Sequence, residues 1–288
     1  MFNKDFYIQW IDGVPIRLKE PFDLNFIHQY GTVFKVFDTQ SSGNLCFGVE
    51  KADKKYFLKF AGAKTINNHD LPVEDAVARL KAAVPKYKDM AHPSLIHLVD
   101  SMDVGDGYLL LFDWEDGESF GDLNPSLGEK FFSLPIIQRM NVFEDILRFH
   151  VHVAQCGYIA IDFNDNSTLY NFHSGKVMIC DIDFYAKQSY MNGMGGIFGI
   201  KALMSPEEFR SAGLLDEITN VYTMGATAFM LLAKGNRSPE AWPLDMKLYD
   251  VVKKAVNDGR SQRQQSVRQL MVEWWAAKMG VHVINKSN

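Results

Sequence analysis

The stretch YIAIDFNDNSTLYNFHSGKVMICDID, Tyr158 to Asp183, carries the strongest fold signal in the chain. Within it two apolar runs, YIAI and VMIC, each end on a carboxylate, at Asp162 and at Asp181. A buried charge is costly unless another group pairs with it. The segment predicts a loop and then a β-hairpin, with strands at TLYNF and KVMICD and a turn at HSG. Such a hairpin can return Asp181 to the side of Asp162, so the two carboxylates either cap local loops or share a ligand.

The composition predicts a folded protein without a broad cationic surface. The chain has 288 residues, of which 47% are hydrophobic and 23% charged, and this length allows two lobes with separate cores. Its formal net charge of −5 argues against nucleic acid or an anionic membrane surface as the main partner. The three cysteines have no CxxC spacing, and no uninterrupted apolar run reaches the roughly 18 residues of a membrane span. We therefore expect a cytoplasmic protein with no membrane and no nucleic-acid partner.

Residues 1–113 contain strand-like runs around one helix-like run. The strand signals are TVFKVFD, NLCFGVE, KKYFLKF and DGYLLLFDW. Between them, PVEDAVARLKAAV has helical spacing of its apolar residues and acidic residues in its first turn. These patterns predict a small antiparallel sheet that carries one helix.

Residues 114–120 begin a polar, turn-rich connector, and residues 121–288 are mainly helical. The connector WEDGESFGDLNPSLGEK predicts a hinge between two lobes. PIIQRMNVFEDILRFHVHVAQCG predicts one long helix closed by Gly157. TNVYTMGATAFMLLAKG is apolar nearly all round, as expected of a helix at the centre of a lobe. With two further amphipathic helices at LYDVVKKAVNDG and SVRQLMVEWWAAKMG, the predicted fold class is α+β.

These phrases, in this order, resemble the eukaryotic-type protein kinase superfamily in an atypical form, over roughly residues 30 to 275. AIDFNDNS stands where the family has HRDxxxxN, and DID stands where it has DFG. YFLKF, AHPSLIHLVD, GIKALMSPEE and NVYTMGATAFMLLAKG resemble the lysine strand, the HPNIVxLxD phrase, the end of the activation segment and the central helix. Arg263 is placed like the arginine that pairs with the glutamate closing that segment, here Glu207, and we expect a structural ion pair between them.

The resemblance implies a bilobal protein kinase-like fold that binds ATP and magnesium and transfers the γ-phosphate to a hydroxyl group of a protein or small molecule. The resemblance implies that Asp162 is the catalytic carboxylate, that Lys59 binds the nucleotide phosphates, and that Asp181 binds magnesium. The other positions that it assigns are Gly43 in the phosphate-binding loop, Asp113, Glu115 and Glu118 beside the nucleotide, and Asn166, Ser167 and Asp183 beside the metal.

The chain departs from the family at several motifs. In the phosphate-binding loop only Gly43 remains, and Asp38 and Gln40 occupy the positions of the earlier glycines. The helix glutamate that should pair with the lysine falls near Ala83. The asparagine of HRDxxxxN is Ser167. The phosphate grip therefore differs from that of the family.

Further departures concern regulation and the acceptor. Ile161 replaces the arginine before the catalytic aspartate, so activation by phosphorylation of the activation segment is not expected. Asn164 replaces a lysine common in serine/threonine kinases, and Asn220 replaces the central-helix aspartate. Three hypotheses stay open: a phosphotransferase, a pseudokinase that serves as a binding or scaffold module, and a small-molecule kinase of the aminoglycoside or choline type.

Overall fold

The computed structural model describes residues 6–40, 42–67, 72–120, 125–192 and 201–285 of the chain. Over these residues the protein is mixed α+β with antiparallel sheets, which confirms the predicted fold class. The chain divides into two compact units, Met1–Ala91 with Ile96–Glu115, and His92–Leu95 with Asp116–Asn288. Within the described ranges, no helix combines the length and the apolar character needed to cross a bilayer.

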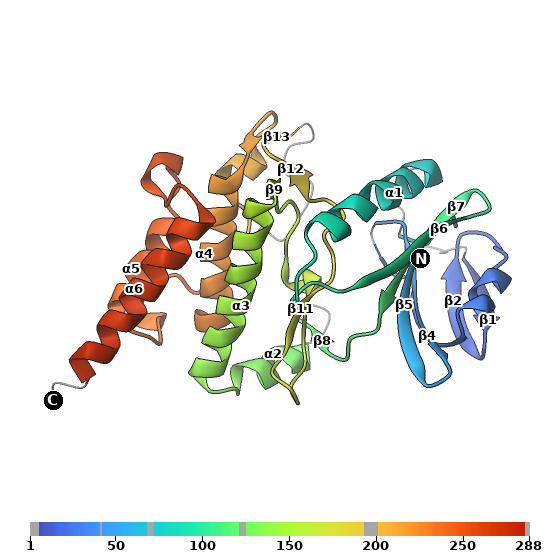
Figure 1. Ribbon diagram of the computed structural model, residues 1–288, viewed down its shortest axis with the longest axis horizontal. Helices are drawn as coiled ribbons and strands as arrows, with labels where there is room; N and C mark the ends of the chain where they lie inside the picture. Colours follow the sequence, from blue (N-terminus) through green and yellow to red (C-terminus); the bar gives the residue numbers. More distant parts are fainter. Residues whose placement is uncertain (1–5, 41, 68–71, 121–124, 193–200, 286–288) are drawn as a thin grey trace, which may run out of the picture. The chain divides into compact units, whose positions relative to one another are not determined.

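A five-stranded antiparallel sheet forms most of the first unit, in the order β3-β4-β5-β7-β6 (Figure 1). Its strands are β3 Thr32–Phe37, β4 Leu45–Lys51, β5 Lys54–Ala61, β6 Leu98–Val104 and β7 Gly107–Asp113. The turn between β4 and β5 has positive φ at Ala52 and Asp53. Positive φ at both central residues gives a turn whose twist matches that of the strands it joins.

One helix and one additional hairpin complete the first unit. The predicted helix is α1 (Val73–Asp89), and it contacts β5, β6 and β7 through the buried face that includes Leu80 and Ala83. The hairpin, β1 (Tyr7–Ile11) with β2 (Val14–Leu18), was not predicted. Its turn at Asp12 and Gly13 has positive φ at both residues, and its inner residues join the core formed by β3, β4 and β5. A short 3₁₀ turn, η1 (Asn25–Gln29), follows.

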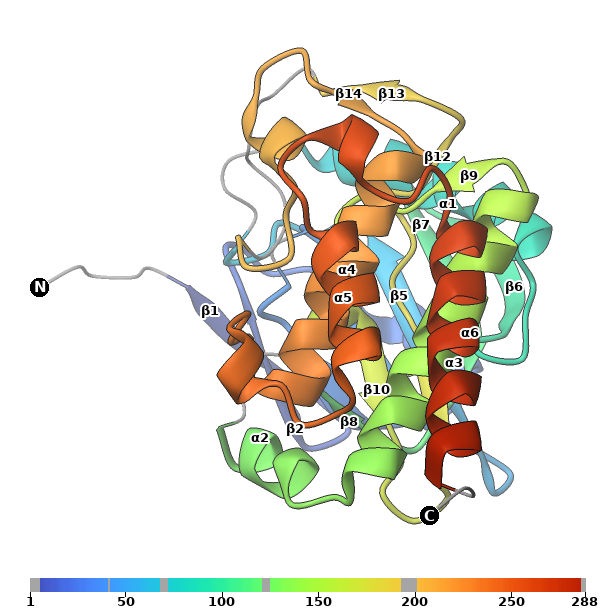
Figure 2. The ribbon, with the colours of Figure 1, turned by 90° about the vertical axis from the view of Figure 1, so that its left-hand side faces the viewer.

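Four long helices organise the second unit (Figure 2). They are α3 Ile136–Gln155, α4 Glu217–Ala233, α5 Met246–Ala255 and α6 Val267–Asn285. As predicted, α4 lies at the centre, since it is buried along nearly its whole length and contacts α3, α5 and α6. A Cβ at Gly225 would lie 2.7 Å from the Cβ of Ala255, so this glycine permits the close approach of α4 and α5.

The predicted β-hairpin is present in the second unit and extends into a three-stranded sheet. β10 (Thr168–Tyr170) pairs with β11 (Val177–Ile179) on one side and with β8 (Glu118–Ser119) on the other. The remaining short elements are β9 Tyr158–Ile159, β12 Ala186–Lys187, β13 Tyr190–Met191, β14 Leu214–Leu215, η2 Asp165–Ser167, η3 Pro206–Phe209, η4 Pro239–Ala241 and η5 Arg260–Gln262.

The connector differs from its prediction. Part of it forms helix α2 (Pro125–Phe132), which the turn-like sequence did not predict, and β8 belongs to the second unit. The short stretch His92–Leu95 also belongs to the second unit. It is held there because the backbone N–H of Ile179 donates to the carbonyl of Ser94 at 2.7 Å.

Candidate functional site

The loop that carries Asp162 begins where α3 ends. Gly157, with φ of 76°, closes the helix, and the backbone then passes through β9 into the loop. Asp162 has φ of 61°, in the left-handed region that a non-glycine residue adopts only at an energetic cost. The side-chain amide of Asn164 donates to the carbonyl of Asp162 at 2.9 Å and lies 3.3 Å from its Oδ1. Aspartate is among the residues that best tolerate this conformation, and Asn164 holds its carboxylate locally.

Asn220 of α4 forms hydrogen bonds to the backbone at the start of the same loop. Its Oδ1 accepts a hydrogen bond from the N–H of Ala160 at 2.8 Å, and its Nδ2 donates to the carbonyl of Ala160 at 2.6 Å. Both residues are buried. The central helix therefore fixes the backbone two residues before Asp162.

Burial and neighbouring charge act together on Asp162. Burial, which is the largest cause, and the negative charges of Asp181 and Glu208 together raise the pKa of Asp162 to about 6, although the hydrogen bond from Asn164 acts in the opposite direction. Like charges within electrostatic reach disfavour ionisation of both groups. The structure thus brings the two predicted aspartates close enough to interact, although the hairpin separates them in sequence.

Asp181 follows β11 and lies on the surface of its unit. Its Oδ1 is 3.4 Å from the backbone N–H of Asp183, which donates to it, and Asp183 itself is buried. The N–H of Cys180 donates to the carbonyl of Ser167 at 2.9 Å. This bond joins the segment before Asp181 to the loop after Asp162.

The other predicted metal positions lie on the same joined loops. Ser167 is buried, and its N–H donates to the carbonyl of Asn164 at 3.0 Å, whereas Asn166 is exposed. Among the described residues, no three His, Cys, Asp or Glu side chains converge as a ready-made metal site. Magnesium is commonly bound by one or two carboxylates with water and substrate phosphates. Asp162 and Asp181, with Asn166 and Ser167 on the same joined loops, are residues of the oxygen-bearing types that bind such a cation.

His150 and Tyr185 form a buried polar pair that was not predicted. Tyr185 lies within electrostatic reach of both Asp162 and Asp181. His150 of α3 places Nδ1 2.8 Å from the carbonyl of Ile146 and Nε2 3.2 Å from the hydroxyl of Tyr185. Because a carbonyl only accepts, Nδ1 carries the proton and Nε2 accepts from Tyr185. The ring of His150 also packs on Phe163, with centroids 4.4 Å apart. One side chain therefore contacts the residue after Asp162 and a residue of the loop that follows Asp181.

The first unit holds the predicted phosphate-binding residues. Lys59 is buried in the middle of the sheet, where β5 pairs it with Cys46 of β4 and Leu110 of β7. Gly43 is buried with φ of 79°, a conformation that favours glycine. Near it, the guanidinium of Arg79 donates to the carbonyl of Ser42 at 3.0 Å, which ties α1 to this loop.

Asp38, at an expected glycine position, is engaged with Arg17 of β2. The guanidinium donates to both carboxylate oxygens, at 2.6 and 3.0 Å, and the backbone N–H of Arg17 donates at 2.8 Å. Burial alone would raise the pKa of Asp38, but these bonds to Arg17 lower it below its ordinary value. The start of the loop is therefore fixed by a carboxylate, at a position where the sequence resemblance predicted a glycine.

The three residues predicted to lie beside the nucleotide have different surroundings. Asp113 forms an ion pair with Lys54 at 3.0 Å, and its Oδ2 lies within hydrogen-bond distance of Nδ1 of His97, at 2.7 Å. Glu115 is the last residue of the first unit and is partly buried. Glu118 lies on β8 of the second unit and pairs with Lys130. The carboxylates of Asp113 and Glu118 are thus committed to cations of the protein.

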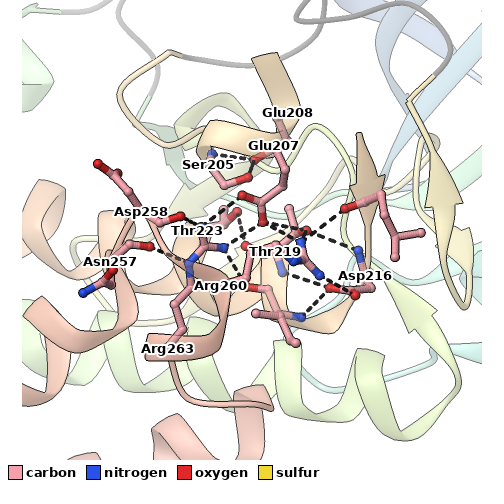
Figure 3. Close-up of polar contacts among 12 residues, drawn as sticks. Ser205, Glu207, Glu208, Asp216, Thr219, Thr223, Asn257, Asp258, Arg260 and Arg263 are labelled. Carbon is pink, nitrogen blue, oxygen red and sulfur yellow. Dashed lines mark hydrogen bonds and ion pairs between the residues drawn. The ribbon is translucent and has the colours of Figure 1, made fainter. Parts of the chain in front are cut away.

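The predicted ion pair between Glu207 and Arg263 is confirmed (Figure 3). Arg263 donates to both oxygens of Glu207, at 2.7 and 3.0 Å, and Arg260 adds a second guanidinium at 2.8 Å. Arg260 also binds Asp216 at 2.5 Å. Burial alone would raise the pKa of Glu207, but the two arginines lower it below its ordinary value. Residues 193–200, which include the start of the GIKALMSPEE phrase, lie outside the described residues.

Comparisons with known proteins do not place the chain in a family. No model of a known protein family matches the sequence, and no curated protein matches it. Any function assigned to the chain therefore depends on its own residues and on their geometry.

Proposed function

We propose that this protein is a magnesium-dependent, kinase-like phosphotransferase that moves the γ-phosphate of ATP to a hydroxyl group of a protein or small molecule. The observation that carries the proposal is the electrostatic interaction between Asp162 and Asp181, both in the second unit. Keeping two carboxylates together is unfavourable unless a cation or a reacting group uses them. The order of the kinase-like motifs along the chain supports the same function.

Asp162 is the residue to which we assign proton transfer. A carboxylate with a raised pKa is a better proton acceptor than an ordinary aspartate and still ionises near neutral pH. Its left-handed backbone, the amide of Asn164 and the anchor at Ala160 hold it in one position. In this role Asp162 orients the acceptor hydroxyl and takes its proton as the new P–O bond forms.

Asp181, supported by Asp183, Asn166 and Ser167, would hold magnesium. When bound, magnesium supplies charge neutralisation for the phosphates of the nucleotide. Lys59 adds a positive charge for the same phosphates, from a buried position in the first unit. The bilobal arrangement of protein kinases belongs to this proposal.

A second candidate function, a pseudokinase that binds a nucleotide or a partner without turnover, is favoured by two observations. The position expected for the partner glutamate of Lys59 is Ala83, which is fully buried on α1. The loop expected to be glycine-rich is instead fixed by the Asp38–Arg17 pair. Both features alter the phosphate grip and leave the pair of aspartates unchanged.

The test is a thermal-shift titration with ATP, with and without magnesium, on the wild-type protein and the variants Lys59→Ala and Asp181→Asn. Ligand at about 100 times its dissociation constant stabilises the folded state by about 2.7 kcal/mol. Asp250→Asn, an exposed change on α5, is the matched control for loss of a carboxylate. We expect magnesium-dependent stabilisation that Asp181→Asn abolishes and Asp250→Asn preserves.

Turnover then separates the two candidates. Release of ADP in the presence of an acceptor mixture, lost in Asp162→Asn, would identify the enzyme. Stabilisation by nucleotide without ADP release would favour the pseudokinase. The absence of any nucleotide effect on the wild-type protein would reject both.

A further inference from the structure

A solvent-open cavity of about 770 Å³ lies in the second unit, apart from the two aspartates. It is formed by the segment after α4, the last turn of α5 and the loop leading into η5. Val256 contributes an apolar side chain. The polar residues that line it are Arg237, Lys253, Lys254, Asn257, Asp258 and Gln262.

Arg237 is a cation of this cavity whose guanidinium is held by two hydrogen bonds. Its Nη1 donates to the hydroxyl of Tyr222 at 2.8 Å, and its Nη2 donates to the carbonyl of Ala202 at 2.9 Å. The hydroxyl of Tyr249 donates to the carbonyl of Arg237 at 3.0 Å, which fixes the backbone. A guanidinium has five N–H donors, so these two bonds leave donors for a ligand. Both acceptors are neutral, and none of the described carboxylates cancels the charge of Arg237.

Two lysines add positive charge on the neighbouring wall. Lys254 binds both oxygens of Glu273, at 2.8 and 3.1 Å, so its charge is partly compensated. Lys253 is exposed, and no carboxylate among the described residues pairs with it. Lysines in the last turn of a helix also interact with its dipole, but Arg237 belongs to a different segment and has no such role. The chain as a whole carries a formal charge of −5, so this local excess of cations stands out.

Neutral and acidic groups complete the lining. Asn257 and Gln262 present amide groups, and Asp258 presents one carboxylate. The backbone carbonyls of Asn257 and Asp258 accept hydrogen bonds from Arg263, at 2.6 and 3.3 Å. The buried Arg263 therefore anchors this part of the wall. A carboxylate beside cations disfavours a ligand that is anionic throughout and suits one that also carries hydroxyl groups.

We propose that this cavity binds a small, hydroxyl-bearing organic phosphate of the sugar-phosphate class. The phosphate group lies against Arg237 and Lys253, since a guanidinium and an ammonium are the side chains that bind phosphate best. The hydroxyl groups face Asn257, Asp258 and Gln262. The cavity volume falls within the range of small-molecule sites. This inference does not depend on the proposed phosphotransferase function.

The experiment is isothermal titration of the full chain with glucose 6-phosphate, and separately with glucose and with inorganic phosphate. We expect glucose 6-phosphate to bind with a dissociation constant in the millimolar range or below, more weakly as salt is added. Inorganic phosphate should bind more weakly than the sugar phosphate, and glucose should not bind.

Single-residue variants locate the site. Lys253→Gln should weaken binding roughly tenfold, the effect of losing one charge-assisted contact. Lys247→Gln is the matched control, because Lys247 is also exposed on α5 but does not line the cavity. Arg237→Gln should weaken binding at least as much as Lys253→Gln.

Several results would overturn the proposal. One is that glucose 6-phosphate does not bind, and another is that Lys253→Gln leaves its affinity unchanged. A third is that Lys247→Gln weakens the affinity as much as Lys253→Gln does, which would indicate a diffuse effect of surface charge. Equal affinity for inorganic phosphate would overturn the sugar-phosphate class. Asp181→Asn should leave the affinity for glucose 6-phosphate unchanged. If that variant abolishes binding, the ligand binds at the pair of Asp162 and Asp181 and not in this cavity.

Discussion

Asn220 and Ala160, 60 residues apart in the sequence, are joined by two hydrogen bonds, in which the amide of Asn220 both accepts from the backbone N–H and donates to the backbone carbonyl. An amide side chain can do both, whereas an ionised carboxylate has no proton to donate. The amide of Asn220 therefore satisfies both backbone groups of Ala160, and through them the central helix holds the loop of Asp162.

We predict that Asn220→Asp lowers the free energy of unfolding by about 2 kcal/mol or more, since it leaves the carbonyl of Ala160 unsatisfied beside a buried charge. Urea unfolding followed by circular dichroism measures the loss. Asn236→Asp is the matched control: Asn236 is exposed, and its Oδ1 accepts from the N–H of Ser238, a role that a carboxylate keeps. An equal loss in both variants would contradict the prediction.

The two arginines that bind Glu207 should differ in their importance (Figure 3). The side chain of Arg263 is fully buried, whereas that of Arg260 is 30% exposed. Removal of one partner of a buried ion pair leaves an uncompensated charge and costs about 3–5 kcal/mol. We therefore expect Arg263→Ala to cost about that much, and Arg260→Ala about 1 kcal/mol.

Urea denaturation of the two variants compares them directly. The double variant Arg263→Ala with Arg260→Ala should lose more than the sum of the single losses, because each single variant leaves the other guanidinium on Glu207 and only the double variant removes both. A larger loss from Arg260→Ala than from Arg263→Ala would show that burial does not decide the strength of these contacts.

Long apolar patterns in the sequence predicted most of the elements. The helix at Ile136–Gln155 has an amphipathic period over several turns, and the helix at Glu217–Ala233 is a long run that is apolar nearly all round. The hairpin after Asp162 is bounded by turn residues. The hairpin β1–β2 was missed although Asp12 and Gly13 form a typical hairpin turn. Helix α2 was missed because its proline and glycine suggest a turn, while a proline at the first helical position is compatible with a helix.

The site was only partly predictable. The predicted hairpin was enough to bring Asp181 back toward Asp162, and the resemblance to the kinase motifs was enough to pair Glu207 with Arg263. The bond of Asn220 to Ala160 and the pair of His150 with Tyr185 depend on how α4 and α3 pack against the loops. The local sequence does not indicate which buried polar groups form hydrogen bonds with each other, so those two contacts could be found only in the tertiary structure.

Asp162 should give the protein a pH-dependent stability of unusual sign. Between pH 3.8 and about 6, the folded state binds a proton at Asp162 that the unfolded state does not. The free energy of unfolding contributed by this group therefore rises as the pH falls through that window. We predict that Asp162→Asn raises the free energy of unfolding at neutral pH by about 1–2 kcal/mol, allowing for partial solvent access.

The substitution suits this test because asparagine also tolerates the left-handed backbone of residue 162. Urea unfolding at neutral pH and at a pH below 4 measures the difference between variant and wild type. The stabilisation should shrink toward zero at the acidic pH, where the wild-type carboxyl is protonated in both states. A stabilisation that is equal at both pH values would assign the effect to something other than the charge.

His150 acts on stability in the opposite direction. Burial lowers the pKa of His150 to about 4, from 6.5. As the pH falls from 6.5 to about 4, the unfolded state takes up a proton that the folded state does not, so the free energy of unfolding falls. The variant Asp162→Asn should reveal this slope, because the opposing contribution of Asp162 is then absent. If the free energy of unfolding of Asp162→Asn stays constant between pH 6.5 and about 4, His150 is protonated in the folded state.

The hydrogen bond between Tyr185 and His150 gives the last prediction. Tyr185→Phe removes only the hydroxyl and leaves Nε2 of His150 buried without its donor, which should cost roughly 1–3 kcal/mol. The double variant His150→Phe with Tyr185→Phe removes both polar partners, so the unfolding free energy should recover in part. In the double variant the acid-side slope contributed by His150 should also vanish. Urea unfolding across the same pH range measures both effects, and a double variant no more stable than Tyr185→Phe would show that packing of the two rings, not their hydrogen bond, holds the loops.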